Sequence, residues 1–440
     1  MEDIKHSEEI ITSESQELNL GESQDWASRA LKAFPAFRHK NYQLYFAGQL
    51  VSLIGSWLQR VAQGWLILQL TDSAFLVGLV AALNTLPILF LALFSGIIID
   101  SFSRKKIIMF TQATQMILAL ILGITTLLNI TTIQEILILS FLLGVIDSLD
   151  NPARQSFVVD MVGKEDLHSA IALNSATFNA ARIIGPAFAG LLIAFVGTGS
   201  AFIINGLSFL AVLLALSRMK VKESKPAEHD NIWQAIHEGV HFCFHHPVIR
   251  TLMVVMAANS IFGWSYATLM PVIAKNIFHL DATGLGFLYV AVGVGALLGG
   301  ILTSAFGKRF SKGLFIIGGI LMFSSALFIF SLTSNLFLSY ILLFFVGLGL
   351  ILSNSTVNTL VQSLVSDSLR GRVMSIYALM FLGFSPIGSF QVGLVAEKYG
   401  SQEAIRIGGL VMFGIGIYLY FRRKSLVKAF RVYSTEPLQS

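Results

Sequence analysis

The sequence has little charge and almost no cysteine for its length. Asp, Glu, Lys and Arg make up 12% of the 440 residues, and Cys243 is the single cysteine. One cysteine excludes an internal disulfide. With 55% hydrophobic residues and a mean hydropathy of +0.73, the composition also excludes an ordinary soluble globular protein. We therefore expect a membrane protein.

The sequence also lacks the features of several other functional classes. Residues 1–28 are polar and acidic, without the apolar core of a signal peptide. No P-loop lysine motif is present, so we expect neither ATP use nor any other cofactor. We find no nucleophile, base and oxyanion-stabilising group placed together, so we do not expect an enzyme.

Long apolar runs dominate the chain. A helix needs roughly 20 apolar residues to cross a hydrocarbon layer about 30 Å thick. The runs are continuous, whereas the strands of a membrane barrel would alternate. We predict an all-α membrane protein with twelve transmembrane helices at 42–69, 74–99, 107–128, 133–152, 168–196, 199–217, 249–274, 284–304, 314–332, 336–358, 373–396 and 403–421.

Basic residues are concentrated in every second loop, which is the pattern that sets membrane orientation. If both termini are cytoplasmic, every inner segment carries Lys or Arg, and Lys275 and Lys398 are the main outer exceptions. This pattern predicts a protein of the inner (plasma) membrane with both termini inside. It also accounts for the sequence pI of about 9.2 without nucleic-acid binding.

One half of the sequence echoes the other. Residues 183–197 return at 386–400 with five identities, and the tripeptide at 102–104 is answered at 310–312. An internal repeat in an apolar chain is typical of a rocking transporter whose substrate site lies between its halves. We therefore predict two pseudo-symmetric six-helix bundles.

The polar stretch in the middle divides the spans into six and six. Its apolar residues recur at helical spacing, which predicts a linker helix on the inner membrane surface. The predicted organisation is a cytoplasmic tail at 1–40, a first bundle at 41–217, a cytoplasmic linker at 218–247, a second bundle at 248–421 and a cytoplasmic tail at 422–440.

The segment between the second and third runs carries a family motif. Gly96, Asp100, Arg104 and Lys105 stand at the positions of G-x-x-x-D-R-x-G-R-K, although Ser101 and Ser103 depart from it. The segment resembles the loop signature of the major facilitator superfamily. The resemblance implies a cytoplasmic charge latch that biases the conformational equilibrium. A plain positive-inside cluster is the alternative interpretation.

Small residues with proline mark the fifth and eleventh runs. Gly185, Pro186 and Gly190 resemble the G-P-x-x-G element of antiporters in this superfamily, with one extra residue in the spacing. We expect these three, with Gly388 and Gly393 of the second copy, to serve helix packing or gating. The alternative is that small residues permit close packing in any membrane bundle.

Further patches point to one branch of the superfamily. NPARQ at 151–155, GSWLQRVAQGW at 55–65, LTDS at 70–73 and LRGRVMS at 369–375 are similar to the branch of enterobactin-type siderophore exporters and macrolide or multidrug effluxers. The resemblance runs from about residue 36 to 421. It implies export driven by the proton gradient.

Charged residues within apolar runs are the strongest functional candidates, because each costs several kcal/mol, of order 3, unless it is paired or hydrated. Asp147, Asp150 and Arg182 are our candidates for proton coupling, and we favour Asp147 as the carrier. Asp150 is spaced to pair with Arg154 at i, i+4. A permanently paired structural carboxylate is the alternative for Asp147.

Candidates for a substrate cavity lie on the runs that surround it in the superfamily. Trp57, Arg60 and Gln63 share one face of the first run. Arg60 suits an anionic or catecholate group, or it snorkels to the outer interface instead. The resemblance adds three further cavity candidates, namely Asn259, Asn354 and Asn358.

Three histidines, His237, His241 and His245, recur every fourth residue on the predicted linker helix. We favour an interfacial basic face over a metal site, and we expect no bound metal.

Together these features predict a secondary active exporter of a small amphipathic organic compound, such as a siderophore or drug, by proton antiport. The expected partners are the substrate, protons and the bilayer. Import of a nutrient or metal chelate by proton symport, lysolipid flipping and a non-transporting scaffold stay open. The oligomeric state also stays open, and a monomer is one of the alternatives.

Overall fold

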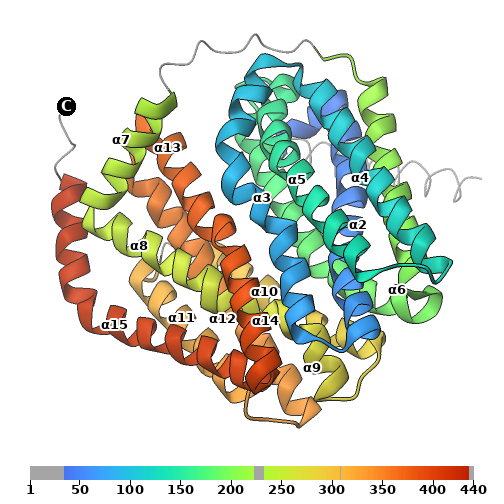
Figure 1. Ribbon diagram of the computed structural model, residues 1–440. Coiled ribbons are helices and arrows are strands. Elements are labelled where there is room, and N and C mark those ends of the chain that lie inside the picture. The colour runs from blue at the N-terminus through green and yellow to red at the C-terminus, as the bar shows by residue number, and fades with distance from the viewer. Residues whose placement is uncertain (1–33, 222–231, 308, 436–440) are drawn as a thin grey trace, which may run out of the picture.

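The protein is helical throughout the part that the computed structural model describes, residues 34–221, 232–307 and 309–435, and no strand occurs in these ranges. The first half, blue to green in Figure 1, begins with a short 3-10 turn, η1 (Pro35–Arg38). Its long helices are α2 (Lys40–Thr71), α3 (Ala74–Ser101), α4 (Arg104–Leu127), α5 (Ile133–Val162) and α6 (Leu167–Arg218).

The second half, yellow to red in Figure 1, follows the predicted linker helix, α7 (Ile232–His245). It contains two broken helices, the first composed of α8 (Pro247–Ala258), η2 (Asn259–Gly263), η3 (Trp264–Leu269) and α9 (Met270–Asn276), and the second of α13 (Asp367–Ala378), η4 (Leu379–Gly383) and α14 (Ser385–Tyr399). The other helices are α10 (Ala282–Phe306), α11 (Lys312–Phe330), α12 (Leu336–Leu364) and α15 (Ser401–Thr435). The last helix continues past residue 421, where we expected a tail to begin.

Nine helical segments of the described chain are long and apolar enough to cross a membrane. Helices α2 and α5, with 32 and 30 residues, are long enough but more polar, and they are not among the nine. Helix α6 holds two of the predicted runs and is bent at Gly197, whose φ of 78° is not helical. A glycine adopts this left-handed conformation without the clash that a Cβ would cause.

The sequence repeat corresponds to repeated local structure. Gly400, the copy of Gly197, also has a positive φ, 94°, where α14 meets α15. The second echo consists of helix caps, because the Ser103 and Ser311 hydroxyls each accept a hydrogen bond, at 3.3 Å, from the backbone N–H three residues later. A side chain at this position satisfies one of the free N–H groups of the first helical turn. The repeat therefore reproduces both the turns and the caps.

Most helix packing stays within one half of the chain. In the first half α2 and α4 pack on α6, and α3 packs on α5. In the second half α10 and α11 pack on α12, and α11 also packs on α15. The two most extensive crossings between the halves are α6 with α10 and α3 with α14.

Both crossings between the halves depend on glycine. A Cβ at Gly190 would overlap Gly286 of α10, and a Cβ at Gly78 would overlap Gly393 of α14. Gly190 and Gly393 are equivalent positions of the repeat. Small residues let two helix backbones approach closely in a membrane, where apolar burial gives no net attraction between helices.

Polar contacts across the halves seal the end of the molecule opposite the linker helix. The Lys275 ammonium lies 2.5 Å from the Asp72 carboxylate and donates to the Leu68 carbonyl at 3.3 Å. The Glu397 carboxylate accepts hydrogen bonds from the Ser73 hydroxyl and the Phe75 N–H, both at 3.0 Å. We call Asp72, Ser73, Lys275 and Glu397 the end seal.

The linker helix α7 packs on α13 at the opposite end of the molecule. Its Glu238 carboxylate pairs with Arg372 of α13, and a Cβ at Gly239 would press on the Arg372 side chain. The linker is thus attached to the second half at the first segment of a broken helix.

We predict that Gly295→Ala destabilises the second half. The added Cβ would overlap the Phe344 carbonyl oxygen of α12, and overpacking of this kind costs about 1–3 kcal/mol. The melting temperature of the purified protein in detergent measures this loss. Gly318→Ala on α11 is the matched control, because a Cβ there meets open space. Replacing this helix glycine with alanine should stabilise the helix by about 1 kcal/mol. Equal melting temperatures for the two variants would contradict the close packing of α10 on α12.

We predict that Lys275→Gln loosens the end seal. The Asp72 and Lys275 side chains are 70% and 33% exposed, so their pair is worth at most about 1 kcal/mol, or roughly a fivefold shift toward separation. Spin labels on Asn129→Cys and Ser334→Cys, in a Cys243→Ser background, would report the distance between the halves by electron–electron resonance. Lys398→Gln is the control, because Lys398 is next to Glu397 of the seal but its ammonium lies over the Tyr399 ring of its own helix. Identical distance distributions in all variants would show that the pair does not hold this end together.

Candidate functional site

A cavity of about 210 Å³ lies between the two halves of the protein. Its walls come from α2, α3 and α6 on one side, and from η3, α9, α10, α12 and α14 on the other. The 3-10 turn η3 contributes Trp264 and Tyr266, and irregular turns of this kind are frequent at functional sites. Its largest lining side chains are aromatic or cationic, namely Trp57, Arg60, Arg182, Trp264, Tyr266 and Tyr289.

Arg60 of α2 forms part of the cavity wall. Its guanidinium lies 4.9 Å from the Trp57 ring centre and 3.5 Å from the Asp147 carboxylate of α5. The Arg60 side chain is 42% exposed and the Asp147 side chain is 15% exposed. The pair is therefore loose and accessible from the cavity on the arginine side.

Asp147 also contacts a third helix, α4. The Gln115 amide of α4 donates to its carboxylate at 2.6 Å. Asp147 is not among the lining residues, so it faces the cavity through Arg60. A carboxylate placed in this way can exchange a proton while its position is fixed.

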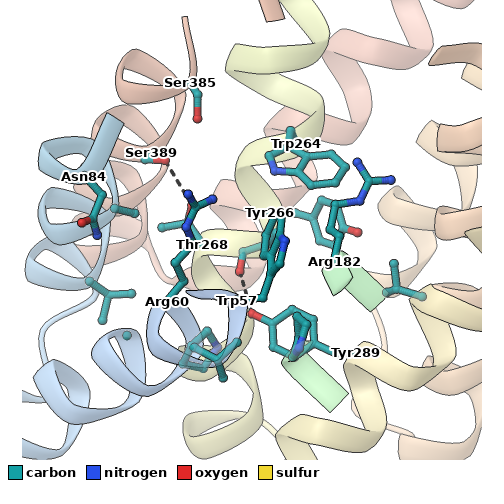
Figure 2. Close-up of a pocket in the computed structure, with 18 of the residues that line it drawn as sticks. Trp57, Arg60, Asn84, Arg182, Trp264, Tyr266, Thr268, Tyr289, Ser385 and Ser389 are labelled. Carbon is teal, nitrogen blue, oxygen red and sulfur yellow. Dashed lines mark hydrogen bonds between the residues drawn. The ribbon is translucent and has the colours of Figure 1, made fainter. Parts of the chain in front are cut away.

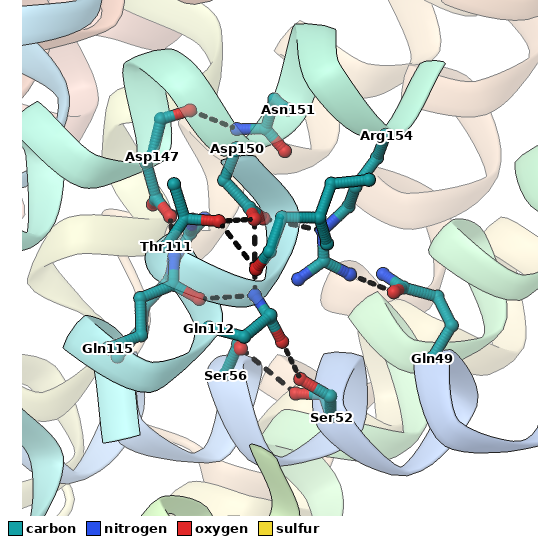
Figure 3. Close-up of polar contacts among 12 residues, drawn as sticks. Gln49, Ser52, Ser56, Thr111, Gln112, Gln115, Asp147, Asp150, Asn151 and Arg154 are labelled. Atoms are coloured by element: carbon teal, nitrogen blue, oxygen red, sulfur yellow. Dashed lines mark hydrogen bonds and ion pairs between the residues drawn. The ribbon is translucent and has the colours of Figure 1, made fainter. Parts of the chain in front are cut away.

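Asp150, one turn further along α5, has a different environment. It accepts hydrogen bonds from the Thr111 hydroxyl at 2.5 Å and the Gln112 amide at 3.2 Å, and it pairs with Arg154 at 2.5 Å (Figure 3). The predicted Asp150–Arg154 pair is thus confirmed. Arg154 also donates to Gln49 of α2. The side chains of this pair are only 4% and 12% exposed, and their contacts join α2, α4 and α5.

Arg182 of α6 lies elsewhere in the same cavity, and the structure does not bring it to Asp147. Its guanidinium lies 4.9 Å from the ring centre of Trp264, a residue of the other half. In Figure 2 Arg60 and Arg182 lie on either side of Trp57. Among the residues that the structure describes, no carboxylate pairs with Arg182.

Of the six cavity residues expected from the sequence, Trp57 and Arg60 line this cavity, and the others do not. Gln63 is buried between α2 and α5, where its amide donates to Ser140 at 3.4 Å. The Asn259 amide donates to Asn354 at 3.0 Å, a contact within the second half. Asn358 accepts a hydrogen bond from Gln362 on its own helix at 2.6 Å.

The expected packing residues lie at helix contacts. A Cβ at Gly185 would overlap Trp57, and one at Gly388 would approach the Ser260 carbonyl of η2. Pro186 lines the cavity. Gly190 and Gly393 form the crossings between the halves that are described above.

The expected latch residues lie at the linker end of the first half. Arg104 pairs with Asp160 of α5 at 2.8 Å, and the Lys105 ammonium donates to the Met219 carbonyl at 2.8 Å. Gly96 has open space around it. The side chain of Asp100 lies outside the described part of the structure, as do residue 308 and most of the first tail.

Sequence reasoning missed Trp264, Tyr266, Tyr289 and Gln115. The three aromatic residues carry no local signal in a chain with 35 Phe and 10 Tyr. Gln115 did carry one, because Thr111, Gln112 and Gln115 form a polar stripe along an otherwise apolar helix. Such a stripe within a membrane span indicates hydrogen bonding to a neighbouring helix.

The three linker histidines stack along α7. The ring centres of His241 and His245 are 3.9 Å apart, and those of His237 and His241 are 6.2 Å apart. In the described ranges no group of three His, Cys, Asp or Glu side chains is placed to hold a metal ion.

Comparison with curated proteins places these features among transporters. The chain is 24% identical to the staphyloferrin A transporter of Staphylococcus aureus (strain NCTC 8325 / PS 47) over 87% of this chain and 96% of that protein. It is 25% identical to the multidrug efflux pump Tap of Mycolicibacterium fortuitum, covering 83% and 92%. It is 24% identical to the enterobactin exporter EntS of Shigella boydii serotype 4 (strain Sb227), covering 88% and 92%.

Solved structures show the same fold at low identity. The nucleoside transporter NupG matches with a TM-score of 0.68 and 12% identity, over 89% of this chain and 99% of that one. An inward-facing, unoccupied bacterial homologue of the lysosomal transporter Spinster matches with a TM-score of 0.65 and 15% identity, over 91% and 99%.

A family model described as transmembrane secretion effector matches residues 31–439, nearly the whole chain. The cavity between two halves, the repeated glycine crossings and the relatives agree with this match, and the protein is a non-enzymatic membrane transporter. The chain belongs to the transmembrane secretion effector family of the major facilitator superfamily.

Proposed function

We propose that this transporter is a secondary active exporter of a small amphipathic organic compound, such as a siderophore or a drug. In this proposal twelve spans form two six-helix bundles, at 41–217 and 248–421, in the inner membrane. Both termini and the linker helix face the cytoplasm, and the end seal faces outward. The names of the relatives, two siderophore transporters and a drug efflux pump, support this direction and substrate range.

The observation that carries the proposal is a cavity between the halves that is closed at one end and lined by Arg60, the accessible member of the Arg60–Asp147 pair. Lys275 and Glu397 close the end remote from the linker, so release there requires the halves to part. The Gly190 and Gly393 crossings provide close contacts about which two rigid halves can rock. The cavity volume is below the roughly 300–1,000 Å³ of typical ligand sites, so binding of a whole substrate also requires the halves to move.

We assign proton coupling to Asp147 and a structural role to Asp150. Asp147 has one loose ionic partner, Arg60, which can move away toward the cavity. Asp150 is enclosed by Thr111, Gln112 and Arg154 and has no comparable freedom. Antiport requires the proton and the substrate to occupy the site alternately. A substrate hydroxyl or ammonium group that donates to Asp147 meets this requirement.

We predict that Asp147→Asn uncouples transport from the proton gradient. The amide cannot take up a proton, so an imposed pH gradient should no longer accelerate transport in proteoliposomes, although transport down the substrate gradient persists. Asp166→Asn, which alters a pair with His39 away from the cavity, is the matched control and should keep its response. Retained stimulation by the pH gradient in Asp147→Asn would exclude Asp147 as the coupling residue.

Asp150→Asn should instead lower stability. Loss of the carboxylate leaves Arg154 buried without its ionic partner, and breaking such a pair costs about 3–5 kcal/mol. We expect a large drop in melting temperature or poor folded yield for this variant. Asp147→Asn should melt close to the wild type, because Gln115 can still hydrogen-bond to the new amide. A stable Asp150→Asn protein would remove the structural assignment.

Comparison of cells with and without the gene tests the direction and the substrate. We expect mass spectrometry of cells and spent iron-poor medium to find a metal-binding metabolite that accumulates inside gene-deleted cells and is depleted from their medium. If metabolites are unchanged and drug susceptibility rises, the compound is a drug-like molecule instead. Loss of uptake in the deleted strain would favour proton-coupled import.

A further inference from the structure

The cavity carries more positive than negative charge. Two of its lining side chains, Arg60 and Arg182, are cationic, and none of its described lining residues is acidic. Asp147 lies behind the wall and balances Arg60. One positive charge, that of Arg182, is therefore left without a protein counterion in the described part of the chain.

Arg182 is held in place without being neutralised. The Trp264 ring lies against its guanidinium at 4.9 Å, and Tyr266 is the ionisable side chain beside it. Stacking on an aromatic face fixes the plane of a guanidinium and leaves its N–H groups free at the edge. Arg182 is half-buried, and its side chain lines the cavity instead of filling a contact between helices.

An arginine without an ionic partner is energetically costly at membrane depth, and such residues mark ligand pathways. A planar carboxylate can form two parallel charge-assisted hydrogen bonds with a guanidinium. A guanidinium that lies against an aromatic ring keeps N–H groups available for such bidentate pairing.

We propose that Arg182, oriented by Trp264, is the binding site for an anionic group of the transported compound, a carboxylate or a group of equivalent charge and shape. The site is separate from the Arg60–Asp147 pair, on the other side of Trp57 (Figure 2). The substrate class is thus an aromatic or apolar organic acid, with its apolar body against Trp57, Tyr266 and Tyr289. This inference rests on the proposed function, because it names a substrate class for the same cavity.

Three probes that share one ring system but differ in charge test the site. They are 1-naphthoate, uncharged 1-naphthamide and cationic 1-naphthylmethylammonium, and equilibrium dialysis against the purified full-length protein measures their affinities. We expect the wild type to bind naphthoate about tenfold or more tightly than the other two, as a charge-assisted hydrogen bond provides. Arg182→Gln should reduce this preference to near unity, while Arg182→Lys should keep part of it.

Two further variants separate the site from general charge effects. Arg250→Gln removes an exposed arginine of α8 and should leave the preference unchanged. Arg60→Gln should weaken naphthoate binding less than Arg182→Gln, because Arg60 already has a partner. The melting temperature of each variant without probe reports whether it folds.

The proposal is overturned if the wild type does not bind naphthoate, if it prefers the amide or the cation, or if a folded Arg182→Gln keeps the preference. It is also overturned if Arg60→Gln has the larger effect. These outcomes are distinguishable from failure of the proposed function. If the cells export a metabolite but the protein shows no preference for the anion, only the Arg182 site is wrong. If the protein prefers the anion but the metabolite comparison shows no export, only the proposed transport direction is wrong.

Discussion

A charge inside the hydrocarbon layer must have a partner or water, and this constraint organises the functional half of the molecule. Asp150 and Arg154 satisfy each other and connect three helices. Arg60 and Asp147 also satisfy each other, but through one loose contact that opens to the cavity. Arg182 lies against an aromatic ring and pairs with no carboxylate of the described residues. This series runs from a fixed pair through a looser pair to a charge without an ionic partner, and it corresponds to the structural, coupling and binding roles that we propose.

The second constraint is the close approach of the two halves. Gly78 meets Gly393 and Gly190 meets Gly286, so each crossing brings backbone against backbone. Such contacts are compact and apolar, whereas the end seal next to them is ionic and partly exposed. A weak ionic seal beside a tight crossing allows the halves to part at one end without separating altogether. The internal repeat supplies both crossings from equivalent positions, which explains why Gly190 and Gly393 match in the sequence.

The parts of the fold that could be predicted are those that depend on local sequence. Hydropathy and helical spacing located the helices and the linker helix α7, and i, i+4 spacing located the Asp150–Arg154 pair. Contacts between distant helices could not be predicted, because they depend on how each helix is rotated about its axis. Arg182 was therefore grouped with Asp147 and Asp150 as a candidate for proton coupling, although its guanidinium lies against Trp264. The exceptional outer lysine, Lys275, was visible in the sequence, but its partner Asp72 was not.

The charge arrangement also limits how the export that we propose could be coupled to protons. With Asp147 ionised, Arg60 and Arg182 leave the site with one net positive charge, and protonation of Asp147 raises this to two. A simple anion would be attracted more strongly to the protonated site, so proton and anion would travel together, as in symport. Antiport therefore requires a substrate with two kinds of group, an anion for Arg182 and a hydrogen-bond donor that competes with the proton at Asp147. A compound with an acidic group and a separate hydroxyl or amine meets both conditions, and a compound with only one of them does not.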